Sequence, residues 1–80
     1  MPTVLRLGSR RYYFYSHEPN EPPHVHVDQG AASAKVWLEP VGLARNLGFR
    51  AHALNAILEE VREHRGHLLE RWHGHFGDSR

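Results

Sequence analysis

The apolar residues of this chain change their spacing once, near residue 50, and this change constrains the fold more than any other feature. Before it, short β-branched and aromatic runs separated by glycine, proline and asparagine are typical of strands. After it, the apolar residues follow the i, i+3, i+4, i+7 spacing of an amphipathic helix, at Leu54, Ile57, Leu58 and Val61. Strands followed by helix predict an α+β fold, in which the helical part packs on one face of a small antiparallel sheet.

The first half predicts a sheet of about four strands, arranged as two hairpins. Gly8-Ser9 and Asp28–Ser33 are expected to form the turns, and the proline-rich segment Ser16–Pro23 is expected to be a loop. Val41–Gly48 fits either a short strand or an irregular connection. The four expected strands are Thr3–Leu7, Arg10–Tyr15, His24–Val27 and Ala34–Leu38.

The second half predicts a kinked helix or two helices between Ala51 and His75. Gly66 marks the expected kink, because glycine costs roughly 1 kcal/mol inside a helix, and the end is expected near Gly74 or Gly77. All 80 residues, 1–80, are expected to form one domain. Alternating charges predict an exposed, ion-paired helix face made of Glu59, Glu60, Arg62, Glu63, Arg65, Glu70 and Arg71.

The chain is short and contains no cysteine. Small domains often need a disulfide, a metal or a partner, and the absence of cysteine excludes the disulfide and every thiolate site. A partner protein, a second copy of the chain or a histidine-bound metal remains as external support. The start has no signal-peptide pattern and no segment reaches the roughly 20 apolar residues of a membrane span. We therefore expect a soluble cytoplasmic protein that does not engage a membrane.

The charge balance argues against a protein that coats nucleic acid unspecifically. Ten Lys and Arg against nine Asp and Glu give a net charge of +1, and Lys35 is the only lysine. The arginine excess suits bidentate contacts to phosphate or carboxylate, although it also arises in GC-rich genomes without a physical reason. Any contact with nucleic acid must therefore be local.

Strand periodicity predicts a basic and aromatic sheet face opposite the core. Because side chains alternate, Val25 and Val27 are expected to face the core, and His24 and His26 the other side. The hairpin is expected to place His26 across from Lys35. Such a face can hold phosphates and stack bases, although aromatic residues also cover wet sheet faces without binding anything. The expected nucleic-acid-binding residues are Arg6, Arg11, Tyr13, Lys35 and Trp37, with Tyr15 and Glu39 on the same face.

The His24-x-His26 spacing has three interpretations. Two imidazoles at i and i+2 lie about 6.6 Å apart along a strand and point the same way. They could act as general acid and base beside a phosphodiester, or they could bind Zn or Ni, with His17 as a third ligand. In the third interpretation they only hydrogen-bond loop carbonyls. His73, in the last turn of the predicted helix, is a secondary candidate.

Several segments resemble one small bacterial family, the domain of unknown function number 4160. They are MPTVLRLG, RRYYFYS, NEPPHVHV, AKVWLEPV, LARNLGF and LLERWHGHFG, which cover nearly the whole chain. The resemblance implies a cytoplasmic, toxin-like protein of a two-gene toxin–antitoxin module, neutralised by an antitoxin-like small protein encoded nearby. The matching motif positions are His24, His26, Trp37, Arg45, Trp72 and His73.

Two functional hypotheses follow. In the first, the protein is a toxin that acts on RNA as a metal-independent endoribonuclease, without a cofactor. His24 and His26 would be its general acid and base, and Arg45 or Lys35 would stabilise the charge on the phosphate. In the second, the protein is a non-enzymatic binding or regulatory subunit that acts through its partner, with or without a histidine-bound metal.

Overall fold

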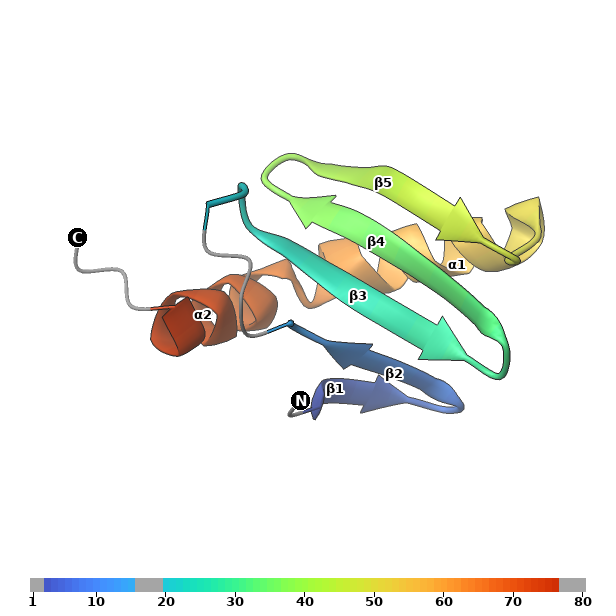
Figure 1. Cartoon of the computed structure of the whole chain (residues 1–80), viewed down its shortest axis with the longest axis horizontal. Coiled ribbons are helices and arrows are strands. Elements are labelled where there is room, and N and C mark those ends of the chain that lie inside the picture. The colour runs from blue at the N-terminus through green and yellow to red at the C-terminus, as the bar shows by residue number, and fades with distance from the viewer. Residues whose placement is uncertain (1–2, 16–19, 77–80) are drawn as a thin grey trace.

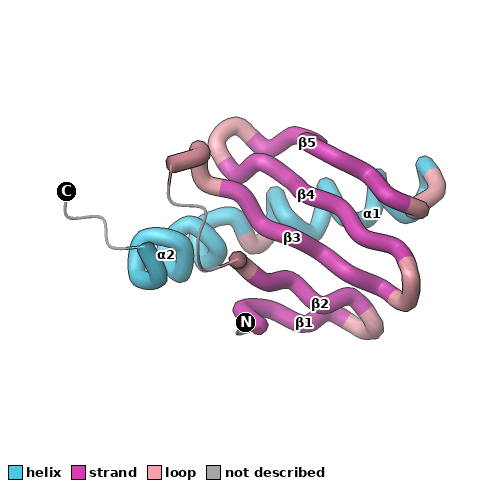
Figure 2. Tube along the Cα trace, viewed as in Figure 1, coloured by secondary structure: helices cyan, strands magenta, loops and turns pink. Residues whose placement is uncertain are grey.

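The computed structural model describes residues 3–15 and 20–76, which form one antiparallel sheet and two helices (Figure 1). The strands lie side by side in sequence order, the first helix crosses one face of the sheet, and the second helix continues beyond the ends of the strands (Figure 2). The side that faces away from the helices is called the outer face below. The elements are β1 (Thr3–Leu7), β2 (Arg10–Tyr13), β3 (His24–Gln29), β4 (Ala32–Leu38), β5 (Val41–Leu47), α1 (Ala51–Glu63) and α2 (Arg65–Phe76).

The α+β prediction is confirmed, but the prediction of about four strands is wrong, because the sheet has five. The additional strand is β5, which occupies the segment that the sequence left open. It lies at the edge of the sheet, and Leu43 and Leu47 are 42% and 54% exposed there. Most of β5 is exposed and its pairing with β4 is irregular, so it lacks the apolar alternation that identifies a half-buried strand.

The strand boundaries also differ from those expected. β2 ends at Tyr13 instead of Tyr15, and β3 and β4 extend until only Gly30 and Ala31 join them. The hairpin turn is therefore much shorter than Asp28–Ser33. Gly30 has a φ of 59°, a left-handed conformation that glycine adopts without steric cost in a tight hairpin turn.

The core lies between the sheet and the helices, where strand parity placed it. Val25, Val27 and Val36 are completely buried, as are Tyr12 and Ile57. The predicted pairing of β3 with β4 is confirmed, since His24 lies opposite Trp37 and His26 opposite Lys35. The remaining buried core residues are Val4, Phe14, Ala34, Leu38, Phe49, Val61, Leu68 and Trp72.

The helical region divides at His64, two residues before the expected kink at Gly66. The backbone of His64 leaves the helical conformation, with a φ of −106° and a ψ of 14°. Its side chain also bonds the chain locally, because Nδ1 lies 2.9 Å from the Glu60 carbonyl oxygen. Neither of the two described helices is long and apolar enough to span a membrane.

A polar cluster joins α1 to the sheet. Both carboxylate oxygens of Glu60 accept hydrogen bonds from Arg10, each at 3.0 Å, and the Tyr12 hydroxyl donates to Glu60 at 2.5 Å. Burial opposes ionisation of Glu60, but the bonds from Arg10 and Tyr12 hold its pKa below its usual value. Glu60 thus joins α1 to the sheet. The prediction that Glu60 belongs to an exposed, ion-paired helix face is wrong.

Candidate functional site

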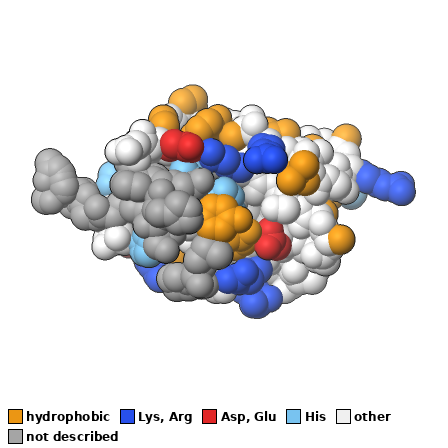
Figure 3. Space-filling model, viewed as in Figure 1, with side chains coloured by type: hydrophobic (Ala, Val, Ile, Leu, Met, Phe, Trp, Pro, Cys, Tyr) orange, Lys and Arg blue, Asp and Glu red, His pale blue; other side chains and the backbone are white. Residues whose placement is uncertain are grey.

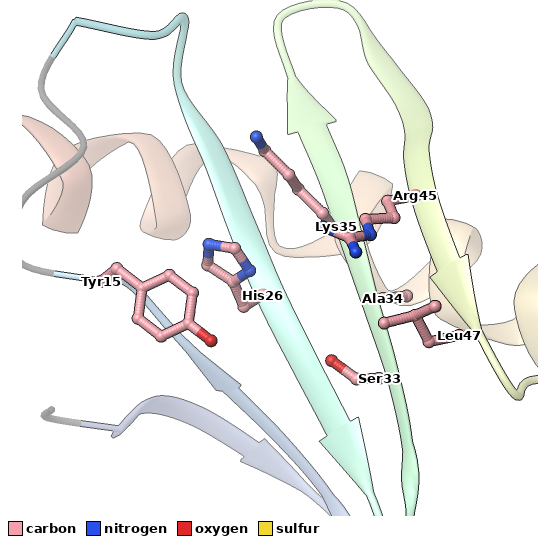
Figure 4. A pocket seen from close by; sticks show the side chains of 7 residues that line it. All are labelled: Tyr15, His26, Ser33, Ala34, Lys35, Arg45 and Leu47. Carbon is pink, nitrogen blue, oxygen red and sulfur yellow. The ribbon is translucent and has the colours of Figure 1, made fainter.

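A pocket of about 330 Å³ lies on the outer face, between β3, β4 and β5 (Figure 4). It combines an imidazole, two permanent cations, a hydroxyl and a phenol ring on one side of the sheet. Figure 3, which shows the same face, has Lys and Arg side chains in separate groups with hydrophobic and histidine side chains between them. The lining residues are Tyr15, His26, Ser33, Ala34, Lys35, Arg45 and Leu47.

Arg45 reaches this pocket because the pairing of β4 with β5 is irregular. Lys35 pairs with Arg45 and the next residue, Val36, pairs with Leu43, so β5 advances two residues while β4 advances one. Such a β-bulge changes which face the following side chains take. Without it, Leu43 and Arg45 would share the core face, whereas here Arg45 lies opposite Lys35 on the outer face.

His26 lies in the pocket wall, among aromatic rings. Its ring centroid lies 4.2 Å from that of Tyr15 and 5.5 Å from that of Tyr13, to which it is nearly parallel. Only 8% of His26 is exposed, on the side that lines the pocket (Figure 4). The aromatic neighbours fix the ring orientation, so its polar edge is presented in one direction.

His24 has a different environment, although it is only two residues away. It is 1% exposed and packs against Trp37 of β4 and Trp72 of α2, with ring centroids 5.7 and 4.9 Å away. Its Nδ1 donates a hydrogen bond to the Pro22 carbonyl at 2.9 Å, because a carbonyl oxygen can only accept. The two rings contact each other at 5.2 Å, but His26 alone lines the pocket.

Lys35 lies at the upper end of the pocket in Figure 4, with its ammonium group pointing away from Ser33 and Leu47. The ammonium nitrogen lies 4.9 Å from the centre of the Trp37 ring and bonds the Glu21 carboxylate. Glu21 is 43% exposed at its side chain, and its carboxylate lies 3.9 Å from His24 Nδ1. Glu21 therefore adds a negative charge beside the predicted basic face.

The three remaining predicted nucleic-acid contacts lie on β1 and β2. Arg6 is exposed opposite Arg11, whose guanidinium lies 4.6 Å from the centre of the Tyr13 ring and donates to the Thr3 hydroxyl. Tyr13 is only 4% exposed, and its hydroxyl donates to Asp28 at 3.0 Å. Burial, with its hydrogen bonds to Tyr15 and Asp28, raises the pKa of Tyr13 above its usual range. These side chains do not line the pocket.

The other predicted residues do not join this site where the structure describes them. His73 is exposed on α2 and is not part of the pocket. His17, the proposed third metal ligand, lies outside the described residues. Within residues 3–15 and 20–76, no group of three or more His, Asp or Glu side chains is arranged to hold a metal ion.

Sequence analysis missed Ser33, Leu47 and Glu21 as residues of this site or its surroundings. Ser33 was assigned to a turn, and Leu47 to a segment of undecided structure. Glu21 lies in a loop that no periodicity describes. Ser33 lies two residues before Lys35, so the two side chains share the outer face. This spacing would identify Ser33 from the sequence if the expected strand began two residues earlier.

Comparison with known proteins identifies a family to which the chain is similar. Residues 10–73 match the family model described as a domain of unknown function (DUF4160). No curated protein and no solved structure matches the chain significantly. The matched region contains β2 to β5, α1 and most of α2, including every residue that lines the pocket. Since the match covers far more than half of the sequence, the chain belongs to the DUF4160 family.

Proposed function

We propose that this protein is a toxin-like component of a bacterial two-gene module and that it acts on single-stranded RNA, with one phosphodiester bound in the outer-face pocket. The observation that carries the proposal is the position of Arg45, which the bulge in β5 brings opposite Lys35 and into the pocket that His26 also lines. Arg45 has no ion-pair partner within residues 3–15 and 20–76, so its guanidinium can bind a phosphate bidentately.

The size and composition of the pocket suit this ligand. Its volume lies within the roughly 300–1,000 Å³ typical of small-ligand sites, which is room for one nucleotide unit. Tyr15 and Trp37 are half-buried on the outer face and offer ring surface for bases, whereas Tyr13 offers very little. With two cations near the pocket and a net charge of +1, the affinity rests on few phosphate contacts.

Cleavage of the bound RNA is the reaction that the His26 and Arg45 pair supports. His26 accepts the proton of the ribose 2′-hydroxyl, the 2′-oxygen forms a bond to phosphorus, and the bond from phosphorus to the 5′-oxygen breaks. The leaving 5′-oxygen takes a proton from water, and Arg45 stabilises the negative charge on the phosphate oxygens. His24 is a positioning residue in this scheme, because its ring is enclosed by Trp37 and Trp72.

Binding of a labelled single-stranded RNA oligonucleotide, followed by fluorescence anisotropy, tests the proposal. Arg45→Ala is expected to weaken binding about tenfold or more, because a charge-assisted hydrogen bond is lost. Arg62→Ala is the matched control, since it removes the same charge from the exposed surface of α1 and is expected to leave binding unchanged. Equal effects of the two substitutions, or no binding by the unmodified protein, would overturn the proposal.

The same variants separate binding from cleavage and from growth inhibition. His26→Ala is expected to bind the oligonucleotide but leave it intact, and induced expression of this variant is expected not to slow growth. Cleavage that persists in His26→Ala would exclude His26 as the proton acceptor. Cleavage that stops in His26→Ala while growth inhibition persists would separate toxicity from RNA cleavage.

The edge of the sheet supports a second function, binding a partner chain. Among the described residues, the large hydrophobic side chains with high exposure are Leu43 and Leu47, and both belong to β5. An edge strand offers unpaired backbone groups to an added strand, and Arg45 favours a partner strand with a carboxylate. Co-expression with the product of the adjacent gene tests this function. A complex that survives Leu43→Lys and Leu47→Lys together would contradict it.

A further inference from the structure

Glu21 is a carboxylate that does not line the pocket but bonds Lys35, one of the two cations that do. Its ion pair with Lys35 neutralises one of the two permanent cations near the site and leaves the other, Arg45, unpaired within the described residues. The permanent charges of the site, counted over Glu21, Lys35 and Arg45, therefore sum to +1. An internal phosphodiester of RNA carries one negative charge, whereas a terminal or free phosphate carries close to two.

Glu21 is held in place by the residues that follow it. The Pro22 carbonyl accepts a hydrogen bond from His24 Nδ1, and the Pro23 carbonyl accepts one from the Leu38 backbone amide, both at 2.9 Å. Proline also restricts the backbone of this segment. The buried His24 ring thus fixes the end of the loop from which Glu21 reaches Lys35, and the carboxylate is a fixed part of the electrostatic environment of the site.

We propose, on the basis of the function proposed above, that Glu21 determines the specificity of the pocket by shifting its preference away from doubly charged phosphate monoesters and toward singly charged phosphodiesters. The carboxylate repels any anion bound between Arg45 and Lys35, and the Coulomb energy is proportional to the product of the two charges. The repulsion of a dianion is therefore about twice that of a monoanion at the same position. This selection favours the interior of an RNA chain over free nucleotides and chain ends.

The charge product also gives the size of the expected effect. Removal of the Glu21 charge should strengthen phosphodiester binding about threefold, which corresponds to about 0.65 kcal/mol and lies within the range measured for exposed charge pairs. Because the energy doubles for a dianion, binding of a phosphate monoester should strengthen by the square of that factor, or about tenfold. The difference between the two factors is what identifies selection by charge.

The experiment measures competition against the labelled RNA oligonucleotide at about pH 8, where a phosphate monoester is doubly charged. One competitor is a uridine dinucleotide with a single phosphodiester, and the other is uridine monophosphate. The variant is Glu21→Gln, which keeps the shape of the side chain and its ability to accept a hydrogen bond from Lys35. Comparing each competitor between variant and unmodified protein cancels the difference in size between the two competitors.

Glu39→Gln is the matched control. Glu39 is also an exposed carboxylate paired with a cation, since it accepts a hydrogen bond from Arg65 at 3.3 Å, and it does not line the pocket. The control makes the same change in net charge. It is expected to leave the inhibition constants of both competitors unchanged.

The outcomes separate this inference from the proposed function. A preferential gain for uridine monophosphate in Glu21→Gln, absent in Glu39→Gln, supports it. Equal gains for both competitors, losses for both, or no change would overturn it, even if RNA binding depends on Arg45 as proposed. If the unmodified protein binds RNA independently of Arg45, or does not bind it, both the proposed function and this inference fail.

Discussion

The Glu60 carboxylate offers the strongest test of how the two layers are held together. Glu60→Ala leaves the Tyr12 hydroxyl, on a side chain with no exposed surface, without its partner, which costs about 1–3 kcal/mol. It also breaks the bidentate bond to Arg10, whose contribution is smaller because Arg10 keeps a bond to Gln29 and both side chains are about one-fifth exposed. The expected loss is about 2–4 kcal/mol.

This loss should be large in a thermal unfolding experiment. A domain of this size has a total stability of roughly 4–12 kcal/mol, and each kcal/mol shifts its Tm by about 4–8 °C. Glu60→Ala should therefore lower the Tm by about 8–32 °C. Glu59→Ala is the matched control, since among residues 3–15 and 20–76 Glu59 pairs only with exposed Arg62, and its loss should cost at most about 0.5 kcal/mol. A similar Tm for the two variants would refute the proposed role of Glu60.

The pH dependence gives an independent check on the same cluster. The pKa of Glu60 is lower in the folded protein than its usual value, because the bonds from Arg10 and Tyr12 outweigh the effect of burial. Its contribution is thus fully present above the unfolded pKa and is lost as the pH falls through the folded pKa. The stability difference between the unmodified protein and Glu60→Gln should shrink as the pH falls below about 4.5. A difference that stays constant with pH would contradict this assignment.

Two further predictions concern single side chains. His24→Ala removes a buried ring between two tryptophans and should destabilise the fold by about 2–4 kcal/mol. His26→Ala, at the pocket wall, should cost less in free energy of unfolding. The reverse order of the two losses in urea unfolding would contradict the assigned environments. Gly48→Ala should cost about 1–2 kcal/mol, because Gly48 has a φ of 102° and a Cβ added there would lie 3.4 Å from the Cα and Cβ of Ala32. Gly42→Ala, with open space around it and no positive φ, should be close to neutral in the same assay, and equal losses would refute the argument from backbone conformation.

The sequence alone predicts the features that follow from a regular spacing of apolar residues, either the alternation of a strand or the stripe of a helix. Alternation along β3 and β4 identified the core face, and the turn at Gly30 then aligned His26 with Lys35 as observed. The apolar stripe identified the side of the helical region that packs on the core. Each of these features is local or repeats regularly, so neighbouring residues carry enough information.

The sequence does not predict features that depend on an interruption of this regular spacing or on contacts between distant residues. The bulge between Lys35 and Val36 decides that Arg45 faces the pocket, but Gly42, the glycine of β5, lies before Leu43 and does not mark the position of the extra residue between Leu43 and Arg45. Likewise, Glu60 lies among charged helix residues, and its partners Arg10 and Tyr12 are some fifty positions away. A charge pattern along one helix cannot show which carboxylate meets a residue of another layer.

The two histidines of β3 show why a shared face does not imply a shared role. Parity correctly placed His24 and His26 on the same side of the strand, and their rings are in contact. However, Trp72 of α2 packs against both Phe14 and His24. The His24 ring is therefore closed off, while the His26 ring lines the pocket. Proton transfer by a histidine pair requires both rings to reach the same phosphate. Because α2 closes off His24, the chemistry proposed for this face rests on His26 and Arg45, and His24 contributes by anchoring the loop that carries Glu21.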